Sequence, residues 1–156
     1  MHLAPKRVIN EPEMMEYLGG PDTKEQVLSR HKRYLELGDK GCMFSIILYP
    51  DLKEVGCIGY WEKVWNCEGI YEIGWSVLPS YQGKGIATGA AKLAIDAATA
   101  ENKYEYIHAF PSINNLASNA ICQKLGFDFI SEHEFEYPLG SYMRCNNWRL
   151  KLNINK

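Results

Sequence analysis

The middle of the chain carries the segment Trp75-Ser-Val-Leu-Pro-Ser-Tyr-Gln-Gly-Lys-Gly-Ile-Ala-Thr88, in which a strand-like run passes through a glycine loop into a helical pattern. Pro79 ends the strand because proline lacks the backbone N–H that pairs with a neighbouring strand. Gly83 and Gly85 let backbone N–H groups approach a ligand closely, and the start of the helix adds a positive partial charge. The segment therefore predicts an anion site suited to a phosphate or pyrophosphate, with Lys84 as a countercharge.

The glycine loop alone leaves other interpretations open. Short glycine patterns are common, so a tight turn with no ligand is one alternative. A Walker phosphate loop needs G-x-x-x-x-G-K-[ST], which the chain lacks. The dinucleotide fingerprint needs a third small residue where the chain has Thr88, and an early βαβ unit that the pattern does not provide. An ATP- or NAD-binding protein that uses the same loop is kept as a further alternative.

Helical and strand patterns continue on both sides of this loop. In chain order, the predicted elements are helices over Glu13–Tyr17 and Thr23–Leu37, strands over Cys42–Tyr49, Val55–Val64 and Tyr71–Leu78, a helix over Gly85–Asn102, a strand over Tyr106–Phe110, a helix over Asn115–Leu125, and strands over Phe127–Tyr137 and Tyr142–Leu152. Turn residues between the first three strands suit an antiparallel meander, and the last two strands form a hairpin. This order predicts an α+β, three-layer fold and not a regular βαβ repeat.

Two periodic patterns predict which side chains face the core. In the strand before the loop, strict alternation separates Glu72, Gly74 and Ser76 from Tyr71, Ile73, Trp75 and Val77. In the helix after the loop, an apolar stripe of helical period contains Ile86, Ala90, Leu93, Ala94 and Ala97. The small residues of this stripe predict close packing of the helix on a sheet.

Length, charge and composition exclude several classes of function. The 156 residues predict a single domain over 1–156. The formal net charge of −2 argues against nucleic-acid binding by bulk electrostatics. The most apolar run, Met43–Tyr49, is too short to cross a membrane, and the start of the chain lacks the apolar core of a signal peptide. The five cysteines form no C-x-x-C pair and the four histidines show no metal-ligand spacing, so we expect a cytoplasmic protein with reduced thiols and no metal.

Two motifs in this order resemble a known family. Gln82-Gly83-Lys84-Gly85-Ile86-Ala87 resembles the Q/R-x-x-G-x-G/A acyl-CoA signature of the GNAT N-acetyltransferase superfamily. Asn115-Leu-Ala-Ser118, followed by Gln123-Lys-Leu-Gly-Phe127, resembles the second signature of that superfamily. Glu72-Ile-Gly-Trp75 and the Asn-x-x-Ser form are most similar to the branch that contains the ribosomal-protein alanine N-acetyltransferases. The resemblance spans roughly Cys42 to Leu152, and the combination is far more specific than the glycine loop alone.

The resemblance implies a fold and a cofactor. The fold is a mixed, mostly antiparallel central sheet of about six or seven strands with helices on both faces. The cofactor is acetyl-CoA, with backbone amides around the pyrophosphate and main-chain groups of the preceding strand beside the pantetheine arm. The implied cofactor-binding residues are Ser76, Val77, Leu78, Gln82, Gly83, Lys84, Gly85, Ile86, Ala87, Thr88, Asn115 and Ser118. The family's first strand would fall near Lys6–Asn10, where it is short or missing.

Acetyl transfer from a thioester needs a deprotonated amine and a protonated leaving thiolate. Glu72 is the candidate general base, with a purely structural carboxylate as the alternative, and Glu62 and His108 are weaker candidates. Many members of the superfamily place a tyrosine seven residues after the motif Asn, where this chain has Cys122. Cys122 is a weak candidate acid, with a buried packing cysteine as the alternative. Ser118 is another possible donor.

These observations predict an N-acetyltransferase that moves an acetyl group from acetyl-CoA to a primary amine by direct attack in a ternary complex. The acceptor would be a protein N-terminus or a small-molecule amine. The expected partners are acetyl-CoA and this amine, with no nucleic acid and no membrane, and the protein would be a monomer or a homodimer. The missing tyrosine keeps a different class open, namely a non-catalytic domain that binds or senses acyl-CoA.

Overall fold

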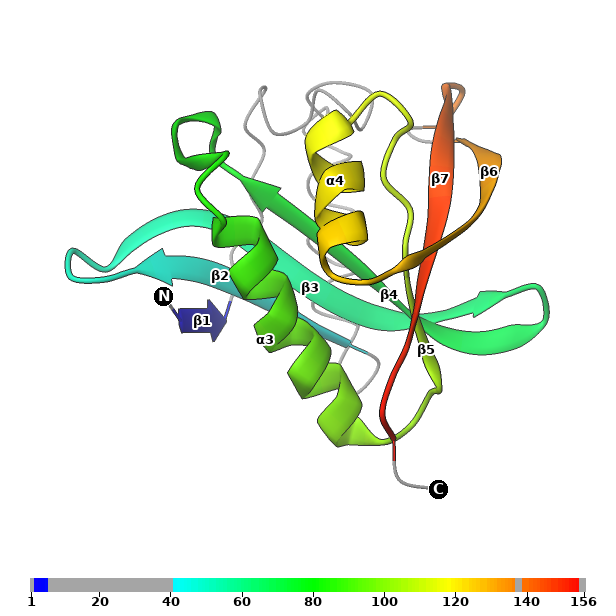
Figure 1. The fold of residues 1–156 in the computed structure, drawn as a ribbon, viewed down its shortest axis with the longest axis horizontal. Helices are drawn as coiled ribbons and strands as arrows, with labels where there is room; N and C mark the ends of the chain where they lie inside the picture. Colours follow the sequence, from blue (N-terminus) through cyan, green and yellow to red (C-terminus); the bar gives the residue numbers. More distant parts are fainter. Residues whose placement is uncertain (1, 6–40, 137–138, 155–156) are drawn as a thin grey trace.

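The computed structural model describes residues 2–5, 41–136 and 139–154, which form one mixed seven-stranded sheet with helices on it (Figure 1). The strands are β1 (His2–Pro5), β2 (Gly41–Leu48), β3 (Lys53–Trp65), β4 (Glu68–Val77), β5 (Tyr106–Ala109), β6 (Asp128–Glu136) and β7 (Tyr142–Lys151). The helices are the 3-10 turn η3 (Pro79–Tyr81), α3 (Ile86–Glu101) and α4 (Leu116–Lys124). The predicted helices over 13–17 and 23–37 lie outside the described residues.

The strand order β1-β2-β3-β4-β5-β7-β6 confirms the mixed, mostly antiparallel sheet. Strands β1 to β4 form an antiparallel meander, and β6 and β7 form the predicted hairpin. Asn66 and Cys67, at the β3–β4 turn, have φ values of 50° and 64°. Two consecutive positive φ values suit the right-handed twist of a two-residue hairpin. The first strand is short and comprises His2–Pro5, slightly earlier than the sequence analysis expects.

The one parallel pair in this sheet, β4 with β5, separates part-way along β4. The pairing runs from Tyr71↔Ile107 to Ile73↔Ala109, and β4 then continues to Val77. Figure 1 shows β4 and the segment after β5 diverging toward α4. Among the described strands none pairs with Gly74–Val77 on that side, so this edge of β4 leaves backbone groups available for another extended chain.

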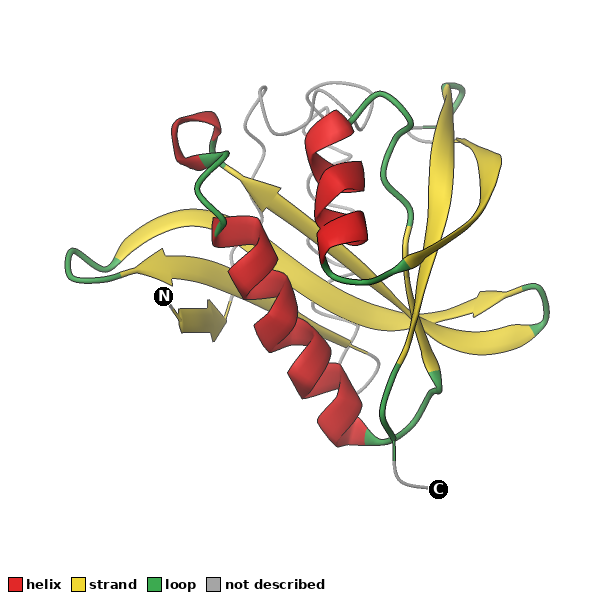
Figure 2. Ribbon diagram, in the orientation of Figure 1, coloured by secondary structure: helices red, strands yellow, loops and turns green. Residues whose placement is uncertain are grey.

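Helices α3 and α4 cover the same face of the sheet (Figure 2). Helix α3 buries Ala90, Ala91, Ala94 and Ala98, whose small side chains let the helix approach β3 and β4 closely. Leu93, which the predicted apolar stripe includes, is 42% exposed. This part of the stripe is wrong because Leu93 lies about 100° around the helix axis from Ala94, away from the alanine face.

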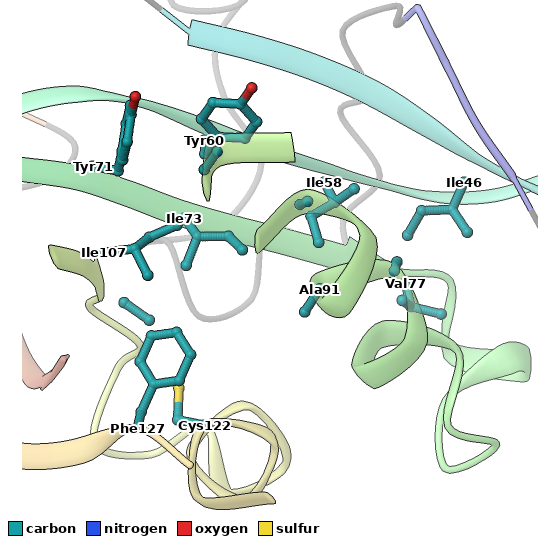
Figure 3. Close-up of a cluster of buried hydrophobic side chains, with 14 of the residues drawn as sticks. Ile46, Ile58, Tyr60, Tyr71, Ile73, Val77, Ala91, Ile107, Cys122 and Phe127 are labelled. Atoms are coloured by element: carbon teal, nitrogen blue, oxygen red, sulfur yellow. The ribbon is translucent and has the colours of Figure 1, made fainter. Parts of the chain in front are cut away.

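The core lies between α3 and the central strands (Figure 3). Tyr71 and Ile73 of β4 and Ile107 of β5 are at most 2% exposed. The hydroxyls of Tyr60 and Tyr71 donate hydrogen bonds to the two carboxylate oxygens of Glu101, at 2.9 and 3.0 Å. The phenols therefore bury their rings while their polar ends tie the last turn of α3 to the sheet. None of the described helices is long and apolar enough to cross a membrane.

Candidate active site

A cavity of about 290 Å³ lies between the glycine loop, the end of β4 and helix α4, and we call it the glycine-loop cavity. Its lining residues are Trp75, Ser76, Val77, Tyr81, Gln82, Gly83, Gly85, Ile86, Ala87, Thr88, Asn115, Ala117, Ser118, Ala120, Ile121 and Lys124. Every predicted cofactor-binding residue except Leu78 and Lys84 is among them. Two motifs separated by almost thirty positions in the sequence are thus brought to the same cavity.

The backbone of the glycine loop is shaped by two left-handed residues. Gly83 and Gly85 have φ values of 73° and 77°, and a Cβ placed on either would meet no atom within 4 Å. The side-chain amide of Gln82 donates to the carbonyl oxygen of Val77 at 2.9 Å and so ties the loop to the end of β4. Gly85 is the N-cap of α3, and no described side chain caps this helix end. Its first backbone N–H groups are therefore available to an anion.

Leu78 and Lys84 have other surroundings. The backbone N–H of Leu78 already donates to the carbonyl oxygen of Val55 at 2.8 Å. The ammonium nitrogen of Lys84 lies 5.5 Å from the centre of the Tyr81 ring. The sequence analysis did not single out Lys124, which places a cation on the α4 side of the cavity. Its position in the Gln123-Lys-Leu-Gly-Phe127 motif was the signal that could have identified it.

The side chain of Asn115 caps helix α4, and that of Asn119 ties the helix to β7. The Asn115 side chain caps the helix by accepting a hydrogen bond from the backbone N–H of Ser118 at 3.0 Å. The amide group of Asn119 donates to the carbonyl oxygen of Ser112 at 2.9 Å, while its oxygen accepts from the side chains of Asn146 and Trp148 on β7. These bonds hold the first turn of α4, which carries Ser118, in position beside β7.

A second cavity of about 430 Å³ lies beside the first, and we call it the aromatic cavity. Its lining residues are Met43, Cys57, Trp61, Lys63, Glu72, Ile73, Gly74, Trp75, Ser76, Ala109, Phe110, Pro111, Ser112, Asn115, Ser118, Phe135, Glu136, Met143 and Cys145. Trp75, Ser76, Asn115 and Ser118 line both cavities. The indole N–H of Trp75 donates to the hydroxyl oxygen of Ser118 at 3.2 Å, which joins β4 to α4 at this junction.

Glu72, on β4, lines the aromatic cavity and forms an ion pair. The ammonium nitrogen of Lys63 lies 2.8 Å from its Oε1. Burial raises the pKa of the Glu72 carboxyl, while Lys63 opposes that rise. The same ammonium lies 4.6 Å from the centre of the Phe110 ring and 5.4 Å from that of Phe135. The ion pair is therefore enclosed by aromatic side chains.

Comparison with known proteins decides the family. Residues 2–128 match the family model described as "Acetyltransferase (GNAT) domain". This chain belongs to the GNAT acetyltransferase family. The match covers both the glycine loop and the helix that carries Asn115, so it includes the two motifs on which the resemblance was based.

Solved structures show the same GNAT fold. A GNAT-family acetyltransferase from Bacillus anthracis is 25% identical, with a TM-score of 0.68 over 91% of this chain and 83% of that one. The ribosomal-protein-S5-alanine acetyltransferase from Vibrio fischeri is 19% identical, with a TM-score of 0.70 over 91% and 86%. The yncA protein from Salmonella typhimurium, solved with its cofactor acetyl-CoA, is 18% identical, with a TM-score of 0.65 over 90% and 80%.

Ser118, the other possible donor, lines both cavities, whereas Cys122, Glu62 and His108 lie outside them. Cys122 is fully buried against Phe127 (Figure 3), and burial raises the pKa of its thiol to about 12. Its place in the core corresponds to the alternative interpretation, a packing cysteine. The Glu62 carboxylate accepts a hydrogen bond from Tyr104 and pairs with Lys103 at 2.8 Å.

His108 is buried on β5, away from the lining of either cavity. Its Nδ1 lies 2.7 Å from the side-chain oxygen of Asn147, and burial lowers the pKa of the imidazole. Of the predicted bases, Glu72 is thus the one that lines a cavity of this GNAT fold. Among residues 2–5, 41–136 and 139–154, no group of three or more His, Cys, Asp and Glu side chains is arranged to hold a metal ion, and the five cysteines are free.

Proposed function

We propose that this chain is an N-acetyltransferase that uses acetyl-CoA to acetylate a primary amine, either a protein N-terminus or a small-molecule amine. The observation that carries the proposal is the meeting of the two cavities at Trp75, Ser76, Asn115 and Ser118. One cavity has the chemistry of an anion site, and the other holds a carboxylate with a raised pKa. Two substrates bound on either side of this junction would react there directly.

The glycine-loop cavity fits the donor substrate. Its uncapped helix start and left-handed glycines suit a pyrophosphate, and Lys124 adds a positive charge. The unpaired edge of β4 over Gly74–Val77 suits an extended amide-containing arm, which would bind as an added strand. Acetyl-CoA has both groups and supplies an activated acetyl thioester. The bound acetyl-CoA in the related yncA structure supports the same choice.

The aromatic cavity supplies the proton acceptor. An amine must be neutral to attack, because its lone pair forms the new N–C bond while the C–S bond of the thioester breaks. We assign Glu72 as the base that takes the amine proton, directly or through one water. Its raised pKa brings it closer to the neutral range in which a general base works best, and Lys63 holds it in place.

Ser118 is the residue best placed to assist the leaving sulfur. Its hydroxyl oxygen accepts the Trp75 indole N–H, which leaves the hydroxyl hydrogen to point toward the junction of the cavities. A thiol has a pKa near 8.5, so a thiolate is a good leaving group. A hydrogen bond to the departing sulfur, followed by protonation from water, is enough to complete the step. In this arrangement the chain needs no dedicated tyrosine at the position of Cys122.

A specific observation favours a second candidate function. Cys122 occupies the position of the family's tyrosine and is buried, so the usual acid is replaced by a packing residue. A chain that has lost that acid could bind acyl-CoA without transferring the acyl group. Such a sensor domain would keep the glycine-loop cavity but would not turn over.

The proposed function is tested by ligand binding followed by turnover. Thermal unfolding is measured with acetyl-CoA, ATP and NAD, all at one common concentration, and a ligand that is present at about 100 times its dissociation constant stabilises by about 2.7 kcal/mol. We expect stabilisation by acetyl-CoA alone, and then amine-dependent release of CoA thiol. Stabilisation only by ATP or NAD would overturn the choice of donor. Binding of acetyl-CoA with no release of thiol across amines, amino acids and peptides would favour the sensor.

A further inference from the structure

We infer that the acceptor carries its primary amine next to an aromatic or large apolar group and has no carboxylate beside that amine. This inference rests on the proposed function and narrows its acceptor. The observation behind it is the wall of the aromatic cavity, which is made from elements far apart in the sequence. Its large apolar side chains include those of Met43 on β2, Trp61 on β3, Phe110 after β5, Phe135 on β6 and Met143 on β7.

Two aromatic side chains of this wall, those of Phe110 and Phe135, hold each other in place. The Phe110 and Phe135 rings have centroids 5.5 Å apart at 66°, and Trp65 packs on both, at 5.0 and 5.7 Å. Pairs at these distances and tilts are favourable beyond their buried area. The wall is therefore formed before the acceptor binds, and an aromatic acceptor would meet it with little rearrangement.

Trp61 brings an aromatic surface to the place of reaction. A Cβ built on Gly74 would lie 3.0 Å from Cη2 of Trp61, so the indole covers the backbone of β4 at that glycine. Gly74 lies between Glu72 and Ser76 on the same face of the strand. An apolar group bound against Trp61 would thus hold its amine between the base and the junction of the cavities.

The charges of the aromatic cavity disfavour an acidic acceptor. Among the residues that the structure describes, its charged lining residues are Lys63, Glu72 and Glu136. Lys63 and Glu72 neutralise each other at 2.8 Å, and the Phe110 ring lies 4.6 Å from the ammonium, so a carboxylate on the acceptor would have to compete with Glu72 for Lys63. Glu136 leaves the lining with a net negative charge, which attracts an ammonium and repels a carboxylate. A free amino acid therefore fits worse than its amide.

A matched set of acceptors tests each part of the inference. Phenylalanine has a carboxylate where phenylalaninamide has an amide, and glycinamide lacks the benzyl group of phenylalaninamide. Spermidine and glucosamine represent polycationic and hydroxylated amines. We expect kcat/KM for phenylalaninamide to exceed that for each of the others by at least about tenfold. Equal or higher values for phenylalanine, glycinamide, spermidine or glucosamine would overturn the inference while the proposed function stands. No turnover of any acceptor would overturn both.

Two further acceptors distinguish the sources of this chemistry. Phenethylamine represents a free arylalkylamine, and a tetrapeptide that begins with Phe represents a protein N-terminus. Both are expected to exceed glycinamide. The one with the higher kcat/KM identifies the source, and failure of both to exceed glycinamide would contradict the inference.

Variants of the wall separate recognition of the acceptor from general damage. Trp61→Ala and the milder Trp61→Leu should raise KM for phenylalaninamide at least about fivefold more than they raise KM for glycinamide. Phe129→Ala is the matched control, because Phe129 is 54% exposed on β6 and packs on Trp148 outside both cavities. A parallel loss with phenylalaninamide and glycinamide would show that Trp61 does not select the apolar group, and would overturn its assigned part.

Discussion

The glycine-loop cavity and the aromatic cavity share a junction but are built from different parts of the chain. The first depends on backbone geometry: two left-handed glycines, an uncapped helix start and an unpaired strand edge. The second depends on side chains from β2, β3, β4, β6, β7 and the segment after β5. A backbone site suits a ligand with invariant phosphate and amide groups, whereas a side-chain site can change its specificity by single substitutions.

The difference predicts which substitutions affect which substrate. Changes in the loop should alter binding of the donor and leave the preference among acceptors unchanged. Changes in the aromatic cavity should alter the rate, pH dependence or acceptor preference and leave the affinity for acetyl-CoA unchanged. The four predictions below test this separation.

The largest effect is expected for Glu72→Gln. Removal of a general base lowers rates by about 10²- to 10⁴-fold, so kcat should fall by this factor while the dissociation constant for acetyl-CoA is unchanged. Steady-state kinetics and calorimetry measure the two quantities. Glu134→Gln is the control, because Glu134 is 56% exposed on β6 and lines neither cavity. A Glu72→Gln enzyme with wild-type kcat would show that the carboxylate is structural.

Gly85→Ala should act on the other cavity. An L-residue in the left-handed region costs about 1–2 kcal/mol, and relief of this strain would move the N–H groups that face the anion. We expect acetyl-CoA to bind about 5- to 30-fold more weakly, with the acceptor preference unchanged.

Gly140→Ala is a matched control for Gly85→Ala. Gly140 has φ 87° and equally open space around its Cβ position, but it lies at the β6–β7 hairpin outside both cavities. It should lose similar stability and keep full affinity for acetyl-CoA. Equal affinities of the two variants would mean that the loop does not hold the donor.

Lys63→Met should shift the pH dependence. Burial raises the pKa of Glu72 and Lys63 lowers it, so loss of the ammonium raises this pKa further. The base is active when deprotonated, and the acid limb of kcat/KM should therefore move to higher pH. Lys103→Met is the control, since its ion pair with Glu62 lies outside both cavities. An acid limb that stays in place or moves to lower pH would contradict the role of Glu72.

The smallest effect on the reaction is expected for Cys122→Ser. A hydroxyl without a hydrogen-bond partner in the core should lower the free energy of unfolding by about 1–3 kcal/mol, which chemical denaturation measures. The value of kcat and its pH profile should not change, because the thiol lines neither cavity. Cys67→Ser, at an exposed turn, should change neither stability nor rate. A drop in kcat for Cys122→Ser without a loss of stability would restore the thiol as the acid.

Sequence analysis was successful for one cavity and incomplete for the other, for a physical reason. Gly83, Gly85 and the strand-to-helix transition are local, so their spacing predicted the loop, and the family resemblance implied most of the residues that line its cavity. The antiparallel meander and the final hairpin were predicted from the turn residues between strands. The family resemblance added the second motif.

The aromatic cavity depends on contacts between distant residues. The antiparallel register of β3 and β4 places Glu62 opposite Tyr71. Lys63 and Glu72 are the next residues on the two strands, and their side chains meet diagonally across the ladder. Phe110 follows β5 and Phe135 lies on β6, so their rings meet only in the folded sheet. No local spacing in the sequence predicts that contact. The role of Cys122 could also not be predicted without the tertiary structure. Helix α4 packs on the core with one side and borders a cavity with the other, and a helical pattern does not distinguish the two sides.

The central claim is that both cavities are filled when the acetyl group moves. Initial velocities measured over a grid of acetyl-CoA and phenylalaninamide concentrations test it most directly. We expect intersecting double-reciprocal lines, and no acetylated protein by mass spectrometry when acetyl-CoA is added alone. Parallel lines together with a covalent acetyl group on the chain that phenylalaninamide removes would show a two-step transfer and contradict direct attack at the junction of the cavities.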